Sequence, residues 1–281
     1  MLSYRHAFHA GNHADVLKHY LLSLVLDYFN EKTAPYWYID THAGAGLYAL
    51  KDAFAQKNGE FETGIARLID AKKSAAPLAD FIELIQSFNA NNDLDFYPGS
   101  PQIAAYYLRA NDKIRLFELH PNDYKLLADN FSKQHRQTKV ECQDGFAGIK
   151  ACLPPPSKRA VVLIDPPYEL KDDYQRVVDC LKDSLKRFGT GTYMVWYPLL
   201  QRPEPAQMLQ EFHKLDIKNW LNINLTVQKP SHEGYGMHGS GLFIVNPPWI
   251  LPKTLQQTMP ILTQLLALDD DADFELTSQI T

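Results

Sequence analysis

The residues of this chain that are best suited to chemistry are Asp165, Pro166 and Tyr168, which follow the apolar run 160–164. The run Ala-Val-Val-Leu-Ile is rich in β-branched residues, which favours a strand buried on both faces of a parallel sheet. Pro166 and Pro167 disfavour both ladder hydrogen bonding and helix, so the strand is expected to stop at Asp165. The pattern therefore predicts a carboxylate held at a sheet edge beside a stiff, extended backbone.

These residue types suit a planar amine that must be alkylated. The exocyclic amine of a nucleobase shares its lone pair with the ring and is a poor nucleophile. If Asp165 and the Pro166 carbonyl each accept one of its N–H bonds, the lone pair is localised on nitrogen, and the ring of Tyr168 stacks on the base. The same residues also fit a structural turn in which Asp165 caps the segment that follows. Taken alone, they leave both interpretations open.

A second candidate site is the glycine turn at Gly44 and Gly46, which follows an expected strand at 36–40. Glycines after a strand let the backbone approach a ligand closely and leave N–H groups available to it. The turn also fits the G-x-G-x-x-A dinucleotide fingerprint, so a nicotinamide oxidoreductase is an alternative. That fingerprint needs an acidic residue about 20 positions further on. Asp70 occupies that place here, but residues 65–69 before it are typical of a helix rather than a strand.

Several expected strands end in an acidic residue or a glycine. The strands are expected at 36–40, 113–118, 139–142, 160–164, 190–197, 218–228 and 240–246. Because the carboxyl ends of parallel strands share one edge of a sheet, Glu118, Asp144 and Asp165 are predicted to lie together there. Glu118 is placed to accept the hydroxyls of a ribose. The sequence predicts an α/β fold with a seven-stranded, mostly parallel sheet whose last strand is antiparallel.

A near copy of the first motif, Asn246-Pro-Pro-Trp249, ends the last expected strand and competes for the catalytic role. If the last two strands pair antiparallel, as the glycine-rich loop 229–239 allows, Asn246 lies at the opposite edge of the sheet from Asp165. We therefore interpret Asn246 as part of a structural turn.

The number of residues between the glycine turn and the strand at 113–118 exceeds what one crossover helix needs. Residues 61–72 and 77–89 have the apolar spacing of amphipathic helices, so a small helical insertion is predicted at about 51–95. Ser100 is expected to cap the helix that restarts the main fold. We expect a single domain over residues 1–268.

The N-terminal region is rich in histidine. Asp15 is expected to cap a helix with one apolar face. His9, His13 and His19 have a spacing that raises the possibility of a metal site. Without nearby cysteines or paired carboxylates, we expect no metal and interpret these side chains as facing an anionic ligand.

The net charge of −5 does not exclude a nucleic acid partner. Five of the 33 acidic residues lie in the acidic tail 269–281, so the rest of the chain has 28 acidic and 28 basic residues. No apolar run is long enough to cross a membrane, and the N-terminus does not have the pattern of a signal peptide. The 3 cysteines show no C-x-x-C pair, which fits a reducing cytoplasm.

Four motifs in order resemble class I S-adenosylmethionine-dependent methyltransferases that act on adenine amines. They are Asp40-Thr-His-Ala-Gly-Ala-Gly46, Glu118, Asp144-Gly145 and Asp165-Pro-Pro-Tyr168. The segment from Tyr4 to His19 is similar to the RlmJ family, bacterial methyltransferases of an adenine N6 in 23S ribosomal RNA. The resemblance covers the chain to about residue 250 and implies a Rossmann-like fold.

The resemblance also implies roles for individual residues. S-adenosylmethionine would be the cofactor, and the glycine turn with Gly44 and Gly46 would approach it. The residues implied to line its site are Lys18, His19, His42, Ser100, Glu118, Asp144, Gly145 and Asp165. Asp165 would hold the target amine and receive its proton, and Tyr4 would meet the substrate RNA together with Tyr168. The family is expected to act as a monomer on bare or partly assembled 23S ribosomal RNA.

Three alternatives stay open at this point. The enzyme could methylate adenine N6 in another RNA or in DNA. A nicotinamide oxidoreductase would use the glycine turn for a pyrophosphate. A non-catalytic RNA-binding module would bind ribosomal RNA without releasing S-adenosylhomocysteine.

Overall fold

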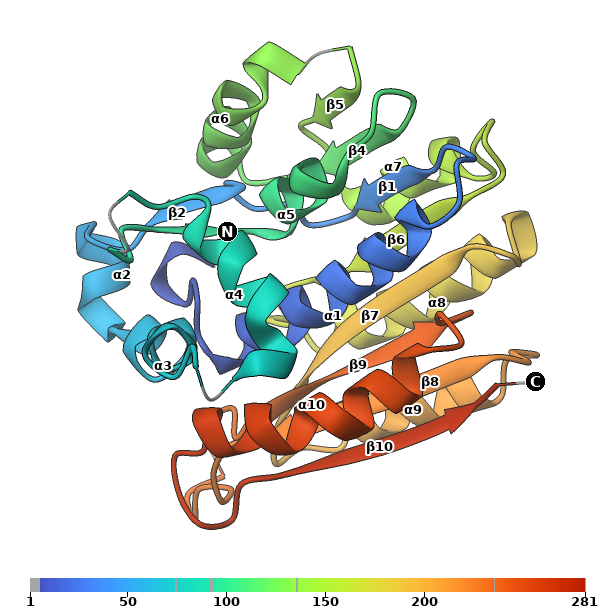
Figure 1. The fold of residues 1–281 in the computed structure, drawn as a ribbon. Helices are drawn as coiled ribbons and strands as arrows, with labels where there is room; N and C mark the ends of the chain where they lie inside the picture. The colour runs from blue at the N-terminus through green and yellow to red at the C-terminus, as the bar shows by residue number, and fades with distance from the viewer. Residues whose placement is uncertain (1–5, 74, 91–92, 135, 235, 281) are drawn as a thin grey trace.

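The computed structural model describes residues 6–73, 75–90, 93–134, 136–234 and 236–280. Its centre is an eight-stranded sheet with the strand order β10-β8-β9-β7-β6-β1-β4-β5 (Figure 1). The strands are β1 (Trp37–Asp40), β4 (Lys113–Phe117), β5 (Thr138–Glu141), β6 (Ala160–Ile164), β7 (Thr192–Leu199), β8 (Trp220–Thr226), β9 (Gly239–Val245) and β10 (Asp273–Gln279). All seven strands expected from the sequence are present.

The direction of the strands fixes where each chain segment leaves the sheet. Strands β5, β4, β1, β6 and β7 pair in parallel, while β9 pairs antiparallel with both β7 and β8. The predicted mostly parallel sheet with an antiparallel last strand is therefore confirmed, but the sheet has eight strands rather than the predicted seven because β10 extends it. Each residue of β6 is buried, as the apolar run at 160–164 predicts for a central parallel strand.

The acidic tail predicted at 269–281 is wrong for most of its length, because residues 273–279 form β10. This strand pairs antiparallel with β8 at the edge of the sheet. Phe274 and Leu276 pack against the core, whereas Asp273 and Glu275 are exposed. The alternation of apolar and acidic residues has the period of a strand with one buried face. The high acid content conceals that pattern in the sequence.

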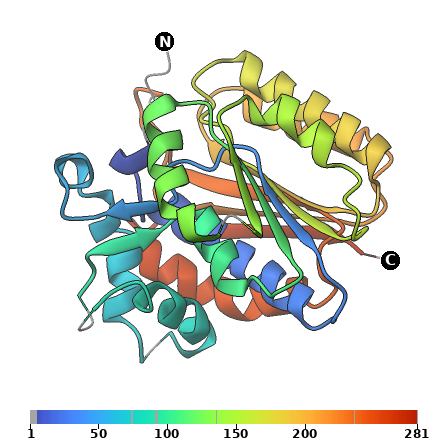
Figure 2. The ribbon, with the colours of Figure 1, turned by 90° about the horizontal axis from the view of Figure 1, so that it is seen from above.

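Helices cover both faces of the sheet (Figure 2). One face carries α1 (His13–Asn30), α5 (Ser100–Tyr107) and α10 (Leu251–Leu266), and the other carries α7 (Gly145–Cys152), α8 (Asp172–Arg187) and α9 (Glu204–His213). Neighbouring residues of β6 face opposite layers: Leu163 belongs to the same core cluster as residues of α1, and Ile164 belongs to the cluster that contains residues of α8. The helix α6 (Pro121–Asn130) follows β4. Among the described residues, no helix has the length and apolarity needed to cross a membrane.

The chain between β1 and β4 contains a helical insertion. Its strands β2 (Leu47–Ala49) and β3 (Phe96–Pro98) pair antiparallel and enclose α2 (Ala53–Asn58), α3 (Ile65–Asp70) and α4 (Ala79–Gln86), with 3₁₀ turns at Glu60–Glu62 and Ala76–Leu78. Two further 3₁₀ turns lie at His6–Phe8 and Ser132–Gln134. The helices expected at 61–72 and 77–89 correspond to α3 and α4, which are shorter than expected.

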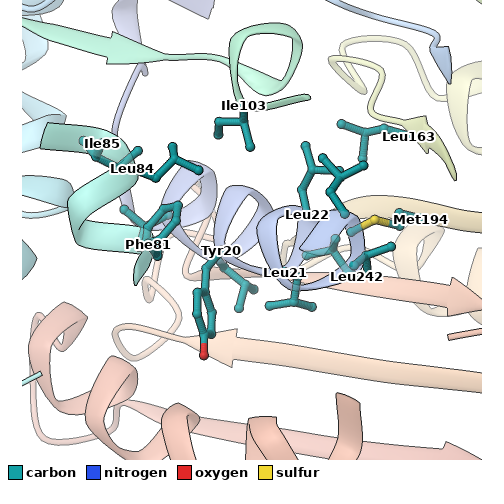
Figure 3. Close-up of a cluster of buried hydrophobic side chains, with 14 of the residues drawn as sticks. Tyr20, Leu21, Leu22, Phe81, Leu84, Ile85, Ile103, Leu163, Met194 and Leu242 are labelled. Atoms are coloured by element: carbon teal, nitrogen blue, oxygen red, sulfur yellow. The ribbon is translucent and has the colours of Figure 1, made fainter. Parts of the chain in front are cut away.

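The insertion shares its core with the main sheet (Figure 3). Helix α1 lies between the two, with Leu22 close to Leu163 of β6 and Tyr20 close to Phe81 of α4. The Tyr20 and Phe81 rings meet edge to face, with centroids 5.6 Å apart. The burial of α1 on both sides ties its N-terminal end firmly to the sheet.

Two predicted helix caps are wrong. Asn12, not Asp15, caps α1, because its side-chain oxygen accepts the Asp15 N–H at 2.9 Å. Gly99 takes the cap position of α5, and the hydroxyl of Ser100 donates instead to the carboxylate of Asp40 at 2.7 Å. The Asp15 side chain is instead buried against His6 and Lys18, and the Ser100 side chain is bonded to Asp40, which lies far away in the sequence. A local sequence pattern does not reveal such partners.

Candidate active site

A cavity of about 380 Å³ opens at the carboxyl edge of the parallel strands. Residues that follow β1, β4, β5 and β6 line it, together with the first turns of α1. The wall contains these predicted residues: Lys18, His19, His42, Gly44, Ser100, Glu118, Asp144, Gly145, Asp165, Pro166 and Tyr168. The fold thus brings into one cavity side chains that lie up to about half the chain apart. Tyr4, predicted to meet the substrate, lies outside the described residues.

Asp165 is held by a buried ion pair. The Lys18 ammonium lies 2.6 Å from Oδ2 of Asp165 and 2.9 Å from Oδ1 of Asp15, on the first turn of α1. Burial disfavours the charge of Lys18, but the two carboxylates outweigh it and raise the pKa of its ammonium group. Among the described residues, none donates to Oδ1 of Asp165 or to the Pro166 carbonyl. These two oxygens remain available to accept hydrogen bonds from a ligand.

Asp15 also lines the cavity, a position that the sequence did not indicate. It is 1% exposed, and its carboxylate also lies 2.8 Å from the His6 ring and accepts the Gly11 N–H. Burial opposes its ionisation, yet His6 and Lys18 hold the pKa of Asp15 well below its usual range. The spacing of Asp15 and Lys18, three apart on a helix, is the one local signal that they pair.

Tyr168 forms a fixed part of the wall. Its φ of 52° lies in the left-handed region, and its hydroxyl donates to the Trp196 carbonyl at 2.6 Å. Its ring centroid lies 4.5 Å from that of Tyr174, and Arg202 donates to the Tyr168 carbonyl at 3.2 Å. The side chain is 3% exposed. These contacts hold the Tyr168 ring in one position. Its stacking on a nucleobase stays a prediction.

The turn after β1 is built around a buried carboxylate. Asp40 accepts hydrogen bonds from the Tyr38 hydroxyl, the Ser100 hydroxyl and the His42 N–H. Burial raises the pKa of Asp40 to about 6. The His42 ring packs edge to face on Phe146, and burial lowers the pKa of His42 to about 4. His42 thus presents a neutral imidazole to the cavity at neutral pH.

Glu118 supports the glycine turn from the end of β4. Its Oε2 accepts the Gly44 N–H at 2.8 Å, and its Oε1 accepts the His120 N–H at 2.7 Å. Burial raises the pKa of Glu118. Gly44 has a φ of 60°, and a Cβ there would lie 2.2 Å from the Tyr48 hydroxyl oxygen, so only glycine fits. Each oxygen of Glu118 keeps a lone pair that can accept from a ribose hydroxyl.

Asp144 and Gly145 form the start of α7. The Asp144 side chain caps the helix by accepting the Phe146 N–H at 2.9 Å, and it pairs with Arg176. A Cβ on Gly145 would lie 1.9 Å from the Thr41 carbonyl oxygen. Glycine is required here because the helix start packs directly on the turn after β1.

Comparison with known proteins decides the family. The model of a family described as "Ribosomal RNA large subunit methyltransferase D, RlmJ" matches residues 33–275. The Escherichia coli (strain K12) protein named ribosomal RNA large subunit methyltransferase J is 46% identical over 260 residues, with 92% of each chain covered. Its namesake from Haemophilus influenzae is 44% identical over 267 residues, with 95% of this chain and 94% of the relative covered. This chain belongs to the RlmJ methyltransferase family.

A solved structure agrees with this family membership across nearly the whole fold. Protein LPL1258 from Legionella pneumophila is 34% identical and superposes with a TM-score of 0.88, covering 96% of this chain and 98% of its own. The predicted Rossmann-like methyltransferase fold is confirmed. Membership of the RlmJ methyltransferase family excludes the nicotinamide oxidoreductase and the non-catalytic RNA-binding module.

One predicted residue is absent from the cavity wall of this RlmJ-family methyltransferase, and the histidines considered for a metal site have different partners. Gly46 does not line the cavity; its φ is 81°, and a Cβ would lie 2.9 Å from the Leu127 side chain. His9 and His19 diverge, because His9 lies 2.9 Å from Glu60 and His19 lies 2.8 Å from the Tyr97 hydroxyl. The described part of the chain contains no group of three or more His, Cys, Asp or Glu side chains arranged to hold a metal.

The competing motif lies at the other edge of the sheet. The Asn246 side-chain amide donates to the carbonyls of Gly189 and Gly191 at 2.9 and 2.8 Å, and the Thr192 hydroxyl donates to its backbone carbonyl. Asn246 is absent from the wall of the 380 Å³ cavity. The structural turn predicted for this motif is confirmed.

Proposed function

We propose that this protein transfers the methyl group of S-adenosylmethionine to the exocyclic N6 of an adenine in 23S ribosomal RNA. The proposal rests on one observation: two kinds of hydrogen-bond acceptor lie in the same cavity. The Glu118 carboxylate and the glycine turn suit a nucleoside cofactor, and Asp165 with the Pro166 carbonyl suits an amine. The E. coli and H. influenzae relatives are named as methyltransferases of large-subunit ribosomal RNA.

The residues of the wall fit the cofactor. Glu118 would accept the ribose hydroxyls, and Asp144 with Gly145 would hold the far side of the nucleoside at the start of α7. His42, which is neutral, adds no charge that would repel a cation. When bound, S-adenosylmethionine supplies a methyl group on a positively charged sulfur. Because this sulfur leaves as a neutral thioether, no metal is needed to assist its departure.

The catalytic work falls to the turn after β6. Asp165 Oδ1 and the Pro166 carbonyl each accept one N–H of the adenine amine and so direct its lone pair toward the methyl group. Lys18 holds Oδ2 at 2.6 Å and thereby fixes the plane of the carboxylate. Tyr168 offers the base a rigid ring. The methylated ammonium product is strongly acidic, so Asp165 needs only to be near to receive its proton.

The physical state of the substrate follows from the recessed site. The adenine must leave its stack to reach Asp165, which is easier when its neighbours are free to move. We therefore infer that bare or partly assembled 23S ribosomal RNA is the substrate. We propose separately, from the family resemblance, that the protein acts as a monomer in the cytoplasm. A contact between Tyr4 and the RNA remains part of the proposal.

The test is a map of N6-methyladenine in ribosomal RNA from a strain that lacks the gene. We expect one adenine of 23S ribosomal RNA to lose its methyl group and to regain it when the gene is restored. Loss at a position in another RNA or in DNA would keep the chemistry but reassign the substrate. An unchanged set of methylated adenines would contradict the proposal.

A further inference from the structure

Leu170 is a large apolar side chain at the mouth of the cavity. It is 64% exposed, it lines the 380 Å³ cavity, and it belongs to neither hydrophobic core cluster. Single exposed leucines are common on protein surfaces, so exposure alone has no functional meaning. Leu170 differs from the others in its place, since it lies two residues after Tyr168, at the end of the turn that begins with Asp165.

The turn that presents Leu170 is braced on both sides. Before it, the Tyr168 hydroxyl is bonded to the Trp196 carbonyl and Arg202 donates to the Tyr168 carbonyl. After it, the Leu170 N–H donates to the Asp173 carboxylate at 3.3 Å, and the Leu170 carbonyl accepts the Asp173 N–H at 3.0 Å. Asp173 is 5% exposed. Hydrogen bonds therefore fix the backbone on both sides of Leu170, and its side chain extends into solvent from this fixed turn.

The charged residues next to Leu170 in the sequence are mostly acidic, namely Glu169, Asp172 and Asp173, and Lys171 is the cation among them. Lys171 has a side chain that is 78% exposed and lies 2.9 Å from Glu204. The case for Leu170 therefore rests on its exposure and its place at the cavity, not on the charge around it. Leu119, another exposed leucine of the cavity, follows Glu118 and so lies at the cofactor end of the wall. Leu170 is thus the exposed leucine at the substrate end.

We propose that Leu170 is a wedge that fills the space left in the RNA stack when the target adenine turns into the cavity. The inference rests on the proposed function. Removing a base from its stack exposes the faces of its two neighbours, and an apolar side chain that inserts between them covers those faces again. Leu170 determines how readily a stacked adenine is accepted, and it touches neither the cofactor nor the reacting nitrogen.

The test compares two forms of one RNA. The first is a fragment of 23S ribosomal RNA with the mapped adenine stacked in a helix. The second has the same sequence with an abasic site opposite the adenine, so that the base is already loosened. The variants are Leu170→Ala and, as a matched control, Leu126→Ala, because Leu126 is 48% exposed on α6 but does not line the cavity. Calorimetric titration with S-adenosylmethionine monitors the cofactor site.

We expect Leu170→Ala to lower kcat/KM at least about tenfold on the stacked RNA and less than about twofold on the loosened RNA. Cofactor affinity stays unchanged, and Leu126→Ala matches the wild type on both RNAs. An equal loss on both RNAs, or no loss on either, overturns the wedge while wild-type turnover still supports the proposed function. If the wild-type protein methylates neither RNA nor intact 23S ribosomal RNA, the proposed function itself fails.

Discussion

Two turns of this protein have nearly the same sequence but different surroundings. Asp165-Pro-Pro-Tyr168 follows β6, which runs parallel to its neighbours β1 and β7. Asn246-Pro-Pro-Trp249 follows β9, which runs antiparallel to β7 and β8. The first turn therefore opens at the carboxyl edge of the parallel strands, beside the glycine turn, and the second lies at the opposite edge. Strand direction, not the motif, decides which turn lies beside the glycine turn.

The side chains of the two turns differ in what they leave unbonded. Asp165 is paired through one oxygen with Lys18, and its other oxygen accepts no bond from the described residues. The Asn246 amide donates both of its hydrogens to backbone carbonyls. The aromatic residues also differ, because Tyr168 is 3% exposed and Trp249 is 71% exposed. The first turn retains acceptors for a substrate, whereas the second uses its polar groups to hold the chain.

The largest expected effect comes from Lys18, the cation that is paired with the carboxylate of the first turn. Lys18→Met leaves the buried carboxylate of Asp15 and the partly buried carboxylate of Asp165 without their shared cation, so we expect the free energy of unfolding to fall by about 3–5 kcal/mol. Turnover should fall as well, because Asp165 loses its fixed plane. Urea denaturation and methyl-transfer rates measure the two effects. Lys18→Arg, which keeps the charge, should recover part of both; an unchanged denaturation midpoint for Lys18→Met would show that the ion pair has no structural role.

The second effect tests Glu118, which we assign to the ribose of the cofactor. Glu118→Ala removes the carboxylate that we assign to the ribose, so S-adenosylmethionine should bind more weakly by about 1.5–3 kcal/mol. Isothermal titration calorimetry measures the affinity, and thermal melting checks that the Gly44 turn survives. Unchanged affinity would move the ribose site elsewhere along this edge.

The third effect concerns the turn that we regard as structural. Asn246→Ala removes two hydrogen bonds from a residue with a φ of 50°, so we expect a loss of about 2 kcal/mol in the free energy of unfolding. Asn246→Gly loses the same bonds but relieves the backbone strain, and it should be less destabilised than the alanine variant. Equal stability of both variants and the wild type would mean that the amide does not hold the turn.

The smallest expected effect concerns the aromatic residues of the two turns, Tyr168 and Trp249. Tyr168→Phe deletes the hydroxyl that donates to the Trp196 carbonyl, and we expect a loss of about 1 kcal/mol in unfolding free energy. Cofactor affinity should not change. A Trp249→Ala variant serves as the control and should retain its turnover, because Trp249 does not line the cavity. Full retention of stability in Tyr168→Phe would argue that the ring is held by packing alone.

Local patterns in the sequence predicted the parts of the site that local structure controls. The apolar run at 160–164 and the prolines after it placed Asp165 at a strand end, and the acid after 113–117 placed Glu118 beside it. Strand β10 escaped prediction because its exposed acids dominate its composition. The pairing of Lys18 with Asp165 joins residues 147 positions apart, and no local pattern encodes such a contact. Likewise, Ser100 fits a helix cap locally, yet burial beside Asp40 gives its hydroxyl a different partner.

The central claim is that the Asp165 turn, and not the Asn246 turn, carries methyl transfer. The most direct test is the incorporation of tritiated methyl groups from S-adenosylmethionine into 23S ribosomal RNA from the deletion strain. The wild type, Asp165→Ala and Asn246→Ala are compared after each is shown to melt cooperatively. We expect Asn246→Ala to match the wild type and Asp165→Ala to be slower by about 10²–10⁴-fold. An inactive Asn246→Ala beside an active Asp165→Ala would contradict both the catalytic assignment and the role given to strand direction.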